Sequence, residues 1–271
     1  MRRLYLVLFT VSLTVSAIAQ SYPSSMTFQK NKYSVATIQV PFEAYLVNDG
    51  VKDYMSRKGL KSTGYKGFTV YRSVPFDSTG QVLGDAYFNI ESKSRSEKDI
   101  TYINLIPVKK DQPLLPANVD DSAGMNRALS FLNRVKPYLI NYAYEQQIHD
   151  QEEAVAKTQS KLSRLKNDSG DIASKIRNYQ NNLKDNKNDQ DQATRDIQNA
   201  GSDPAALSKA NKKMSKLQDR QNDYEKRLRN AQTDADENRK DLSDQQSLLQ
   251  KQSQTLDALK QKQQSASASL P

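Results

Sequence analysis

The chain contains no cysteine and no tryptophan, and it has one histidine among its 271 residues. Without cysteine it can form no disulfide, no thiolate nucleophile, no zinc–thiolate site and no cysteine-linked lipid anchor. The histidine, His149, falls in a predicted helix that offers no cleft with a nucleophile or a carboxylate. We therefore interpret His149 as a solvated helix residue.

Motifs of catalysis are also missing. The sequence has no glycine-rich phosphate loop, no metal-ligand spacing and no nucleophile elbow. Asp120-Asp121 is interpreted as a helix cap rather than a carboxylate pair, and Glu152-Glu153 point to adjacent faces of one helix. We expect no catalytic, cofactor-binding or metal-binding residues and no cofactor, so the chain is not expected to be an enzyme.

Long hydrophobic runs are absent after residue 19, and no later stretch is apolar enough to cross a bilayer, which takes about 20 residues. The one apolar run, Leu4 to Ser16, follows Arg2-Arg3 and precedes Ala17-Ile18-Ala19, a small-x-small cleavage pattern. Residues 1–19 are predicted to be a signal peptide, with a retained anchor as the alternative. The mature protein is then exported to the periplasm or cell surface, and the style of signal and the lack of cysteine suggest a bacterium.

The feature that dominates the remaining chain is a seven-residue apolar repeat from Ile148 to Leu259. Taking Ile148 as position a, the a and d positions carry mainly Leu, Ile, Val, Ala and Tyr, with some Asn, Gln, Ser and Thr. The positions between them are Lys, Asp, Gln, Asn and Ser, which suit a solvated face. A sustained 3.5-residue period indicates a left-handed coiled coil.

One break, Gly201-Ser202-Asp203-Pro204, interrupts the repeat. Gly201 is suited to ending one helix, Ser202 or Asp203 to capping the next, and Pro204 to its first turn. So short a connection predicts antiparallel helices. Residues 145–262 are therefore predicted to form an antiparallel coiled-coil hairpin with its turn at 200–204, followed by a frayed tail, 263–271.

The register that centres the turn makes specific predictions. Polar core residues should meet polar ones, Asn186 opposite Gln221 and Ser169 opposite Asn238, while Leu165 meets Leu242. Three flanking ion pairs are expected: Asp196–Lys213, Asp189–Arg220 and Lys175–Asp234. Farther from the turn, mixed layers such as Val155–Gln252 and Gln151–Leu256 predict weak packing. That base either frays or is covered by other helices, as in a homo-oligomer.

Residues 27–144 have a different composition: they are rich in aromatic and β-branched residues, and apolar residues alternate with polar ones. Strands are predicted at 35–42, 65–74, 84–91 and 100–108, with one helix from Asn48 or Asp49 to about Lys58 and another opening at Asp121 or Ser122. The order β-α-β-β-β-α predicts a small α+β domain, a sheet with helices on one face. Pro137 is expected to kink the last helix rather than end it.

Two features of this sequence bear on partners. Tyr71, Tyr87 and Tyr102 lie on the strand faces away from the most regular apolar stripe, either as an exposed aromatic patch or packed at a sheet edge. Lys and Arg outnumber Asp and Glu by 40 to 31, which favours weak attraction to anionic envelope components. The excess is spread over both halves, so no single basic patch is expected, and without a recognition module neither is nucleic-acid binding.

Together these features predict a non-catalytic exported coiled-coil protein, a structural or protein-interaction element of the bacterial envelope with an unidentified protein partner. The alternative is a periplasmic holdase chaperone. The plan of a β-containing body with basic helical arms is similar to that of the Skp-type periplasmic chaperones, in charge and architecture rather than in any motif. A third hypothesis places an enzyme or ligand-binding site in the α+β domain.

Overall fold

The computed structural model describes residues 20–28, 30–77, 79–80, 83–94, 96–110, 112 and 122–268. The predicted signal peptide 1–19 and Asp120-Asp121 lie outside the described residues. The chain divides into two compact units. The rod unit is His149–Ala258, and the head unit is the described chain up to Ile148 together with the residues from Leu259 onward.

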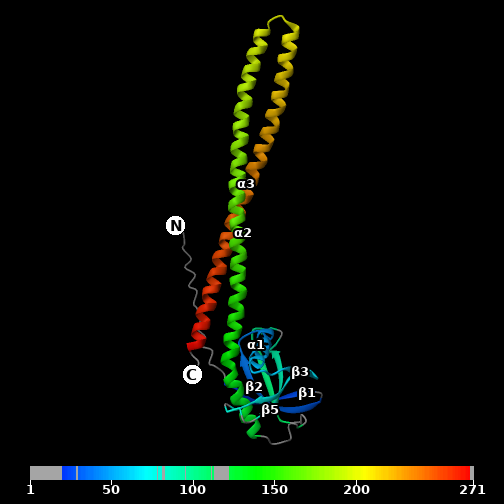
Figure 1. Ribbon diagram of the computed structural model, residues 1–271, viewed down its shortest axis with the longest axis vertical. Coiled ribbons are helices and arrows are strands. Elements are labelled where there is room, and N and C mark those ends of the chain that lie inside the picture. Colours follow the sequence, from blue (N-terminus) through cyan, green and yellow to red (C-terminus); the bar gives the residue numbers. More distant parts are fainter. Residues whose placement is uncertain are drawn as a thin grey trace, which may run out of the picture. The chain divides into compact units, whose positions relative to one another are not determined.

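The head unit is built on a six-stranded antiparallel sheet (Figure 1). Its strands are β1 (Tyr22–Phe28), β2 (Asn31–Val40), β3 (Ser62–Tyr65), β4 (Phe68–Pro75), β5 (Leu83–Ser92) and β6 (Thr101–Lys109), and α1 (Ala44–Arg57) separates β2 from β3. They lie in the order β1-β2-β6-β5-β4-β3. Two long helices follow, α2 (Ser122–Ala200) and α3 (Pro204–Ala268). An α+β domain followed by a helical pair was predicted and is confirmed.

The predicted order β-α-β-β-β-α is wrong, because the sheet has two more strands. β1 begins five residues before the predicted start of the domain at residue 27 and runs to Phe28. It contains Pro23 and few apolar residues, and its place at the sheet edge tolerates both. The strand predicted at 65–74 is a hairpin, β3 and β4, that turns at Lys66-Gly67. Both residues have positive φ, 47° and 86°, as a tight two-residue hairpin turn requires.

Helix α1 begins earlier than its sequence signals suggested. Its N-cap is Glu43, which makes no side-chain capping hydrogen bond, and neither Asn48 nor Asp49 caps it. Leu46 and Val47 are buried in the core, so burial of the first turn outweighs the missing cap. Helix α2 begins at Ser122 and runs through Pro137 to Ala200 without a break.

The main core lies between one face of the sheet and two helices, α1 and the first part of α2. Alternate residues of the inner strands meet α1 and the first turns of α2, and Ile38, Met55, Phe88, Ile103 and Phe131 are each at most 2% exposed. Gly50 lets α1 approach α2 closely, since a Cβ there would lie 3.1 Å from Leu139 and Tyr142. Helices on one face of the sheet, as expected, therefore build this core.

The opposite face of the sheet carries a second apolar cluster, to which no described helix contributes a residue. Its buried members are Tyr33, Val35, Phe68, Val70, Tyr87, Ile106 and Val108, with Met26 and Phe28 packed against them. The rings of Phe28 on β1 and Phe68 on β4 meet edge to face at 4.9 Å between centroids. Because these strands are first and fifth in the sheet order, the sheet must curl around this cluster.

A bulge in β4 changes which residues share a face. Phe68, Val70 and Val74 were expected on one side and Tyr71 on the other. The register shifts between Tyr71 and Val74, at Ser73 with φ of 54°, so Tyr71 and Val74 both enter the main core. The extra residue inverts the alternation beyond it.

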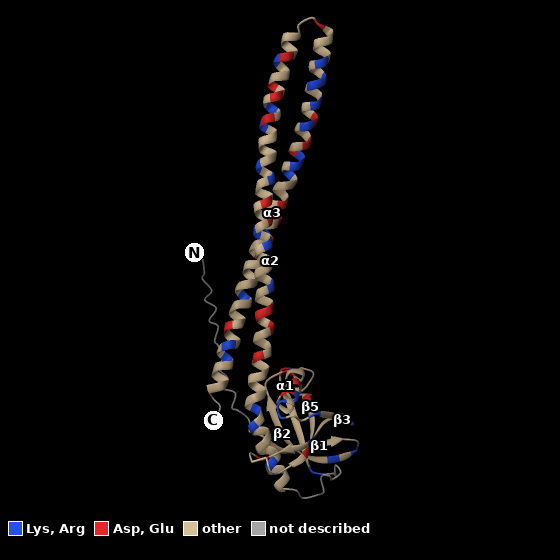
Figure 2. Cartoon of the chain, in the orientation of Figure 1, with Lys and Arg blue, Asp and Glu red and all other residues tan. Residues whose placement is uncertain are grey.

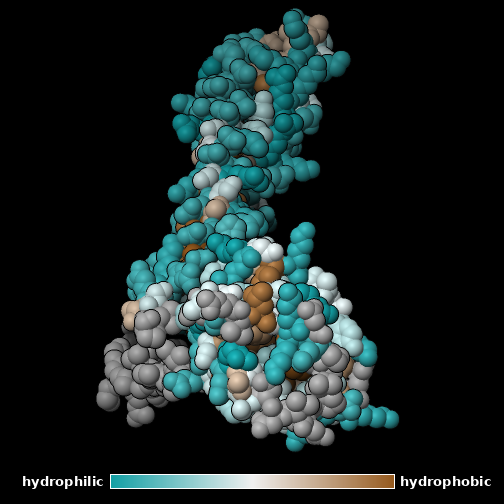
Figure 3. Space-filling view, turned by 60° about the horizontal axis from the view of Figure 1, so that its bottom comes forward, coloured by the Kyte–Doolittle hydropathy of each residue, from teal (hydrophilic) through white to brown (hydrophobic). Residues whose placement is uncertain are grey.

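In the rod unit α2 and α3 pack against each other as antiparallel helices. Every predicted a and d position from Ile148 to Leu259 is buried or partly buried except Ser169, whereas most positions between them are exposed. The helical surface in Figure 3 is accordingly mostly hydrophilic. At the turn Gly201 has φ of 52°. Asp203 caps α3 by accepting hydrogen bonds from the amides of Ala205 and Ala206 at 2.9 and 3.3 Å.

The end of α3 differs from the expectation of a frayed tail. Residues 263–268 are helical, and the Gln263 side chain donates a 3.0 Å hydrogen bond to the Asn141 side chain on α2 within the head unit. Residues 269–271 lie outside the described residues. No helix in the described part of the chain is both long and apolar enough to span a membrane.

Candidate interaction surface at the hairpin tip

The residues considered for chemistry in the sequence do not converge in the structure. His149 is exposed on α2, and Glu153 pairs with Lys157 at 2.6 Å one turn along the same helix. Across the described residues, no three His, Asp or Glu side chains gather as they would around a metal ion. His149 and Glu153 are therefore surface residues of α2.

Among the described residues of the head unit, three buried or half-buried polar clusters are candidate sites, and the members of each hydrogen-bond to one another. The first surrounds Asp85, which is 4% exposed. Its carboxylate accepts a hydrogen bond from Arg72 and another from the Ser73 backbone amide at 3.1 Å. Arg72 also lies over the Tyr87 ring, 5.7 Å from its centroid. Asp85 thus holds the β4 bulge in place.

The second cluster is a polar row across three neighbouring strands on the curled face. Thr37 donates to the side-chain oxygen of Asn104 at 2.8 Å, and the Asn104 amide donates to Asn89 at 3.1 Å and to Glu91 at 3.4 Å. Thr37 and Asn104 are 3% and 7% exposed. Their polar atoms satisfy one another, as buried polar groups must, so the row is accounted for by structure alone.

The third cluster joins α1 to α2. Tyr138 and Arg57 both donate to the Asp53 carboxylate, Arg57 at 2.6 Å. These hydrogen bonds, that of Tyr138 first, lower the pKa of Asp53. Burial, and then the bond to Asp53, raise the pKa of Tyr138 to about 12. Both groups keep their ordinary ionisation at neutral pH, so the cluster fastens the helices and offers no acid–base pair.

The exposed tyrosine patch considered in the sequence is not formed. Tyr71 is 1% and Tyr87 4% exposed, and Tyr102 is partly buried. The reason is that both faces of the sheet carry a packed apolar cluster, so Tyr71 enters the main core and Tyr87 the cluster on the opposite face. Tyr71 and Tyr87 are therefore packed inside the head unit, and Tyr102 alone keeps part of its surface exposed.

The interface between the two helices of the rod unit contains buried polar residues, and their side-chain amides donate mainly to backbone carbonyls of the facing helix. Asn186 donates to the Leu217 carbonyl at 3.0 Å and Asn238 to the Leu165 carbonyl at 3.1 Å, each across to the other helix. Neither predicted partner, Gln221 for Asn186 or Ser169 for Asn238, accepts these bonds. An inward amide reaches a main-chain oxygen more readily than a side chain on the facing helix.

Gln190 donates to the Leu217 carbonyl at 3.3 Å and to Gln221 at 2.8 Å. Gln190 and Leu217 occupy a layer of the predicted register. Of the three predicted flanking ion pairs, Asp196–Lys213 is the one formed in the described rod unit, at 3.4 Å between Nζ and Oδ2. The register predicted from the turn is consistent with these contacts, although the individual hydrogen-bond partners differ.

Near the turn, a groove opens between the two helices. Small side chains form its floor and lysines its rim: it is lined by Asp196, Asn199, Ala200, Ala206, Lys209, Ala210, Lys212, Lys213 and Lys216. The lysines lie one helical turn apart or next to one another and so project from one side of α3. All four are exposed. We name this set, Lys209, Lys212, Lys213 and Lys216, the tip lysines. Figure 2 colours the Lys and Arg positions along this part of α3 blue.

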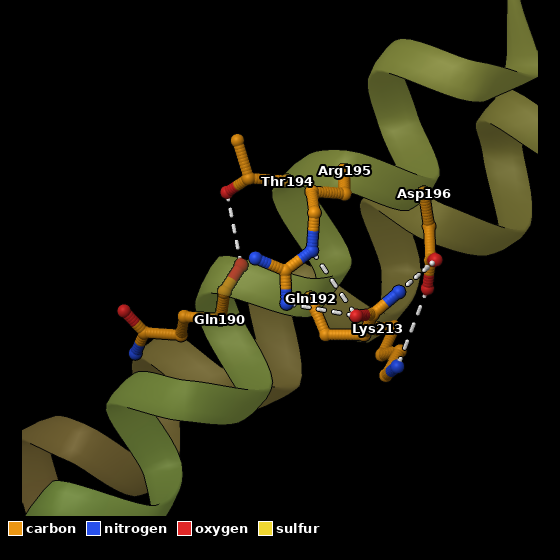
Figure 4. A network of polar contacts seen from close by, with 6 residues as sticks. All are labelled: Gln190, Gln192, Thr194, Arg195, Asp196 and Lys213. Atoms are coloured by element: carbon orange, nitrogen blue, oxygen red, sulfur yellow. Dashed lines mark hydrogen bonds and ion pairs between the residues drawn. The ribbon is translucent and has the colours of Figure 1, made fainter.

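One carboxylate enters the groove, and it is held in a small network (Figure 4). Asp196 accepts hydrogen bonds from Gln192 at 2.9 Å and from Lys213 at 3.4 Å. Arg195 in turn donates to the Gln192 side-chain oxygen at 2.8 and 3.2 Å. The bond from Gln192 first, and then that from Lys213, lower the pKa of Asp196. Asp196 therefore stays ionised and partly neutralises Lys213.

The other tip lysines have no such partner. In the described part of the chain no carboxylate oxygen lies within 4.0 Å of Lys209, Lys212 or Lys216. The sequence expectation that no single basic patch exists is therefore wrong. The net charge of each half of the chain does not reveal a local cluster, because acidic residues elsewhere in the same half offset it. The spacing of these lysines on one predicted helix is nevertheless visible in the sequence.

No family model, no curated protein and no solved structure matches this chain.

Proposed function

We propose that this chain is an exported, non-catalytic protein of the bacterial envelope, and that its rod unit provides the surface on which a partner protein binds. The observation that carries the proposal is the exposure pattern of the rod unit. Its inward positions are shielded and its outward positions are solvated along His149–Ala258. A pair of helices offers an extended surface and little interior, which suits binding along its length better than enclosing a substrate.

The state of the head unit supports the same proposal. Both faces of its sheet carry packed apolar clusters, and the three polar clusters described above form internal hydrogen bonds. The third hypothesis, an enzyme or ligand site in the head, therefore gains no support from the described residues.

Export and binding require separate tests. For export, the full chain is expressed in a bacterium, the cells are fractionated and the mature N-terminus is sequenced. We expect Gln20 as the first residue of an envelope-associated form, and an intact cytoplasmic chain would refute export. For binding, a photocrosslinking residue is placed at exposed Asn222 of the rod or at exposed Lys61 of the head. Rod-specific adducts in intact envelopes support the proposal, and adducts from Lys61 alone contradict it.

The base of the rod unit favours a second candidate, the oligomeric holdase. Leu248 is 41% exposed on α3, and the side-chain oxygen of Gln252 is buried without a hydrogen-bond partner. An exposed leucine beside an unsatisfied buried acceptor indicates packing that two helices do not complete. Helices from a second copy would cover Leu248, in line with the homo-oligomer considered in the sequence.

Sedimentation at several concentrations tests this candidate. Leu248→Glu is compared with Ser247→Glu, a neighbouring exposed position that gains the same charge. Oligomerisation through the base predicts that Leu248→Glu alone yields monomers. The holdase further predicts that the oligomer, at near-stoichiometric ratio, keeps an unfolded outer-membrane protein from aggregating. A wild-type monomer without that effect removes this second candidate.

A further inference from the structure

The tip lysines carry a more specific inference. We propose that the hairpin tip binds the phosphate headgroups of an anionic phospholipid surface through Lys209, Lys212 and Lys216. This deepens the proposed function and rests on its envelope location, where such surfaces are met. The binding chemistry itself can be tested in vitro, independently of export.

Charge density is the first reason. Three ammonium groups without a carboxylate partner project from one side of α3, and Lys213 adds a fourth that is shared with Asp196. Elsewhere in the rod unit acidic and basic residues nearly balance. The tip therefore presents a local positive potential that a general excess of lysine would not produce.

The composition of the groove argues for a lipid surface over a protein. Protein interfaces centre on large apolar or aromatic anchors, and among the described residues none of the exposed large hydrophobic side chains belongs to the tip. Recognition of carboxylates also favours the planar fork of arginine, whereas the cationic residues that line the groove are all lysines, which act as point charges. A sheet of phosphate headgroups requires no apolar anchor and no fixed geometry.

These properties define how the binding should behave. Without an apolar anchor the tip stays at the headgroup level, and the attraction is screened by salt. A lysine close to an anionic bilayer surface contributes about fivefold to affinity, so three contribute roughly 100-fold. Asp196 opposes binding, because it places a negative charge within the groove and holds Lys213.

The experiment measures co-sedimentation of the chain from Gln20 onward with vesicles. One set contains equal parts of phosphatidylglycerol and phosphatidylcholine, and the other phosphatidylcholine alone. We expect binding to the anionic vesicles only, weakening as salt rises. Changing Lys209, Lys212 and Lys216 together to Gln should lower the affinity by roughly 100-fold, and Asp196→Asn should raise it by about fivefold.

The matched control removes the same charge elsewhere on α3, by changing exposed Lys226, Lys240 and Lys251 to Gln; it should lower the affinity less than tenfold. Far-UV circular dichroism verifies that all variants remain helical. Equal losses in both triple variants, or no binding to anionic vesicles, overturn the proposal. The proposal is also overturned if the chain does not bind vesicles but binds soluble polyglutamate, and the tip variant abolishes that binding. The same holds if the chain does not bind vesicles but forms a salt-sensitive dimer that the tip variant abolishes. A failure of export leaves these results unchanged, so the two proposals can fail separately.

Discussion

Gly84 on β5 provides a sharp test of the packing in the head unit. A Cβ at this position would lie 2.8 Å from the backbone oxygen of Val108 on β6 and 2.9 Å from the Phe76 ring. Neither neighbour can easily retreat. The Val108 carbonyl belongs to the β5–β6 ladder, and Phe76, 4% exposed, packs edge to face on Phe131 at 5.5 Å between centroids. Gly84→Ala therefore forces a backbone or core shift.

Overpacking of this kind costs about 1–3 kcal/mol of unfolding free energy. The matched control is Gly64→Ala on β3, where a Cβ would meet no atom within 4 Å. That change should be neutral or should stabilise by about 0.4–1 kcal/mol, because it restricts the unfolded chain. In a domain of this size the Gly84 variant should melt about 4–8 °C lower for each kcal/mol lost.

The assay is urea and thermal unfolding followed by near-ultraviolet circular dichroism of the aromatic residues. Far-ultraviolet signals are less useful here, since α2 and α3 dominate them. If Gly84→Ala and Gly64→Ala unfold alike, the described approach of β5 to Phe76 is incorrect, and the reasoning from close contacts in this sheet fails.

Three further predictions concern single side chains. Asn238→Ala should destabilise the rod unit by about 1 kcal/mol in urea unfolding, because its amide donates to a carbonyl of α2, whereas Asn222→Ala at an exposed site should have no effect. Gln252→Leu removes a buried oxygen without a partner and should stabilise by about 1–3 kcal/mol; a loss of stability would contradict that. Tyr138 has its pKa raised to about 12 by burial and by Asp53, so the stability it adds is fully present below its unfolded value near 10 and is lost as pH rises through 12. Tyr138→Phe should remove this part of the alkaline decline in unfolding free energy, and an unchanged profile would assign it elsewhere.

The rod could be predicted in detail because its information is local and periodic. The heptad positions from Ile148 to Leu259 and the turn residues Gly201 and Asp203 each act within one or two helical turns. The register then follows from the short turn, and Asp196–Lys213 forms as predicted. The hydrogen-bond partners of the inward amides did not follow, because backbone carbonyls of the facing helix compete with side chains and leave no mark in a sequence pattern.

The sheet was harder for a physical reason. β1 and β3 are edge strands whose side chains are largely exposed, so they lack the apolar alternation that reveals inner strands. The curl that buries Tyr87 depends on a contact between Phe28 and Phe68, far apart in the chain. The bulge at Ser73 depends on Asp85 from another strand. Each of these features arises between strands and is invisible within any one of them.

The tip lysines were missed for a different reason. Their spacing places them on one side of a helix that the heptad already predicted, so the position of the cluster was available from the sequence. What the sequence could not supply was the pairing: one lysine meets Asp196 across the groove, and three do not. That distinction depends on which residues of α2 lie opposite.

The amide contacts between the arms of the hairpin limit how its length can evolve. In the pairs Asn186–Leu217, Asn238–Leu165 and Gln151–Gln252 the two residue numbers have the same sum, so one alignment serves all three. Seven residues inserted into one helix would shift that helix by two turns relative to the other at every pair farther from the turn than the insertion. In each of those pairs the amide donor would no longer lie opposite its acceptor carbonyl. The hairpin can therefore lengthen or shorten without losing these contacts only if both helices gain or lose a heptad at facing positions.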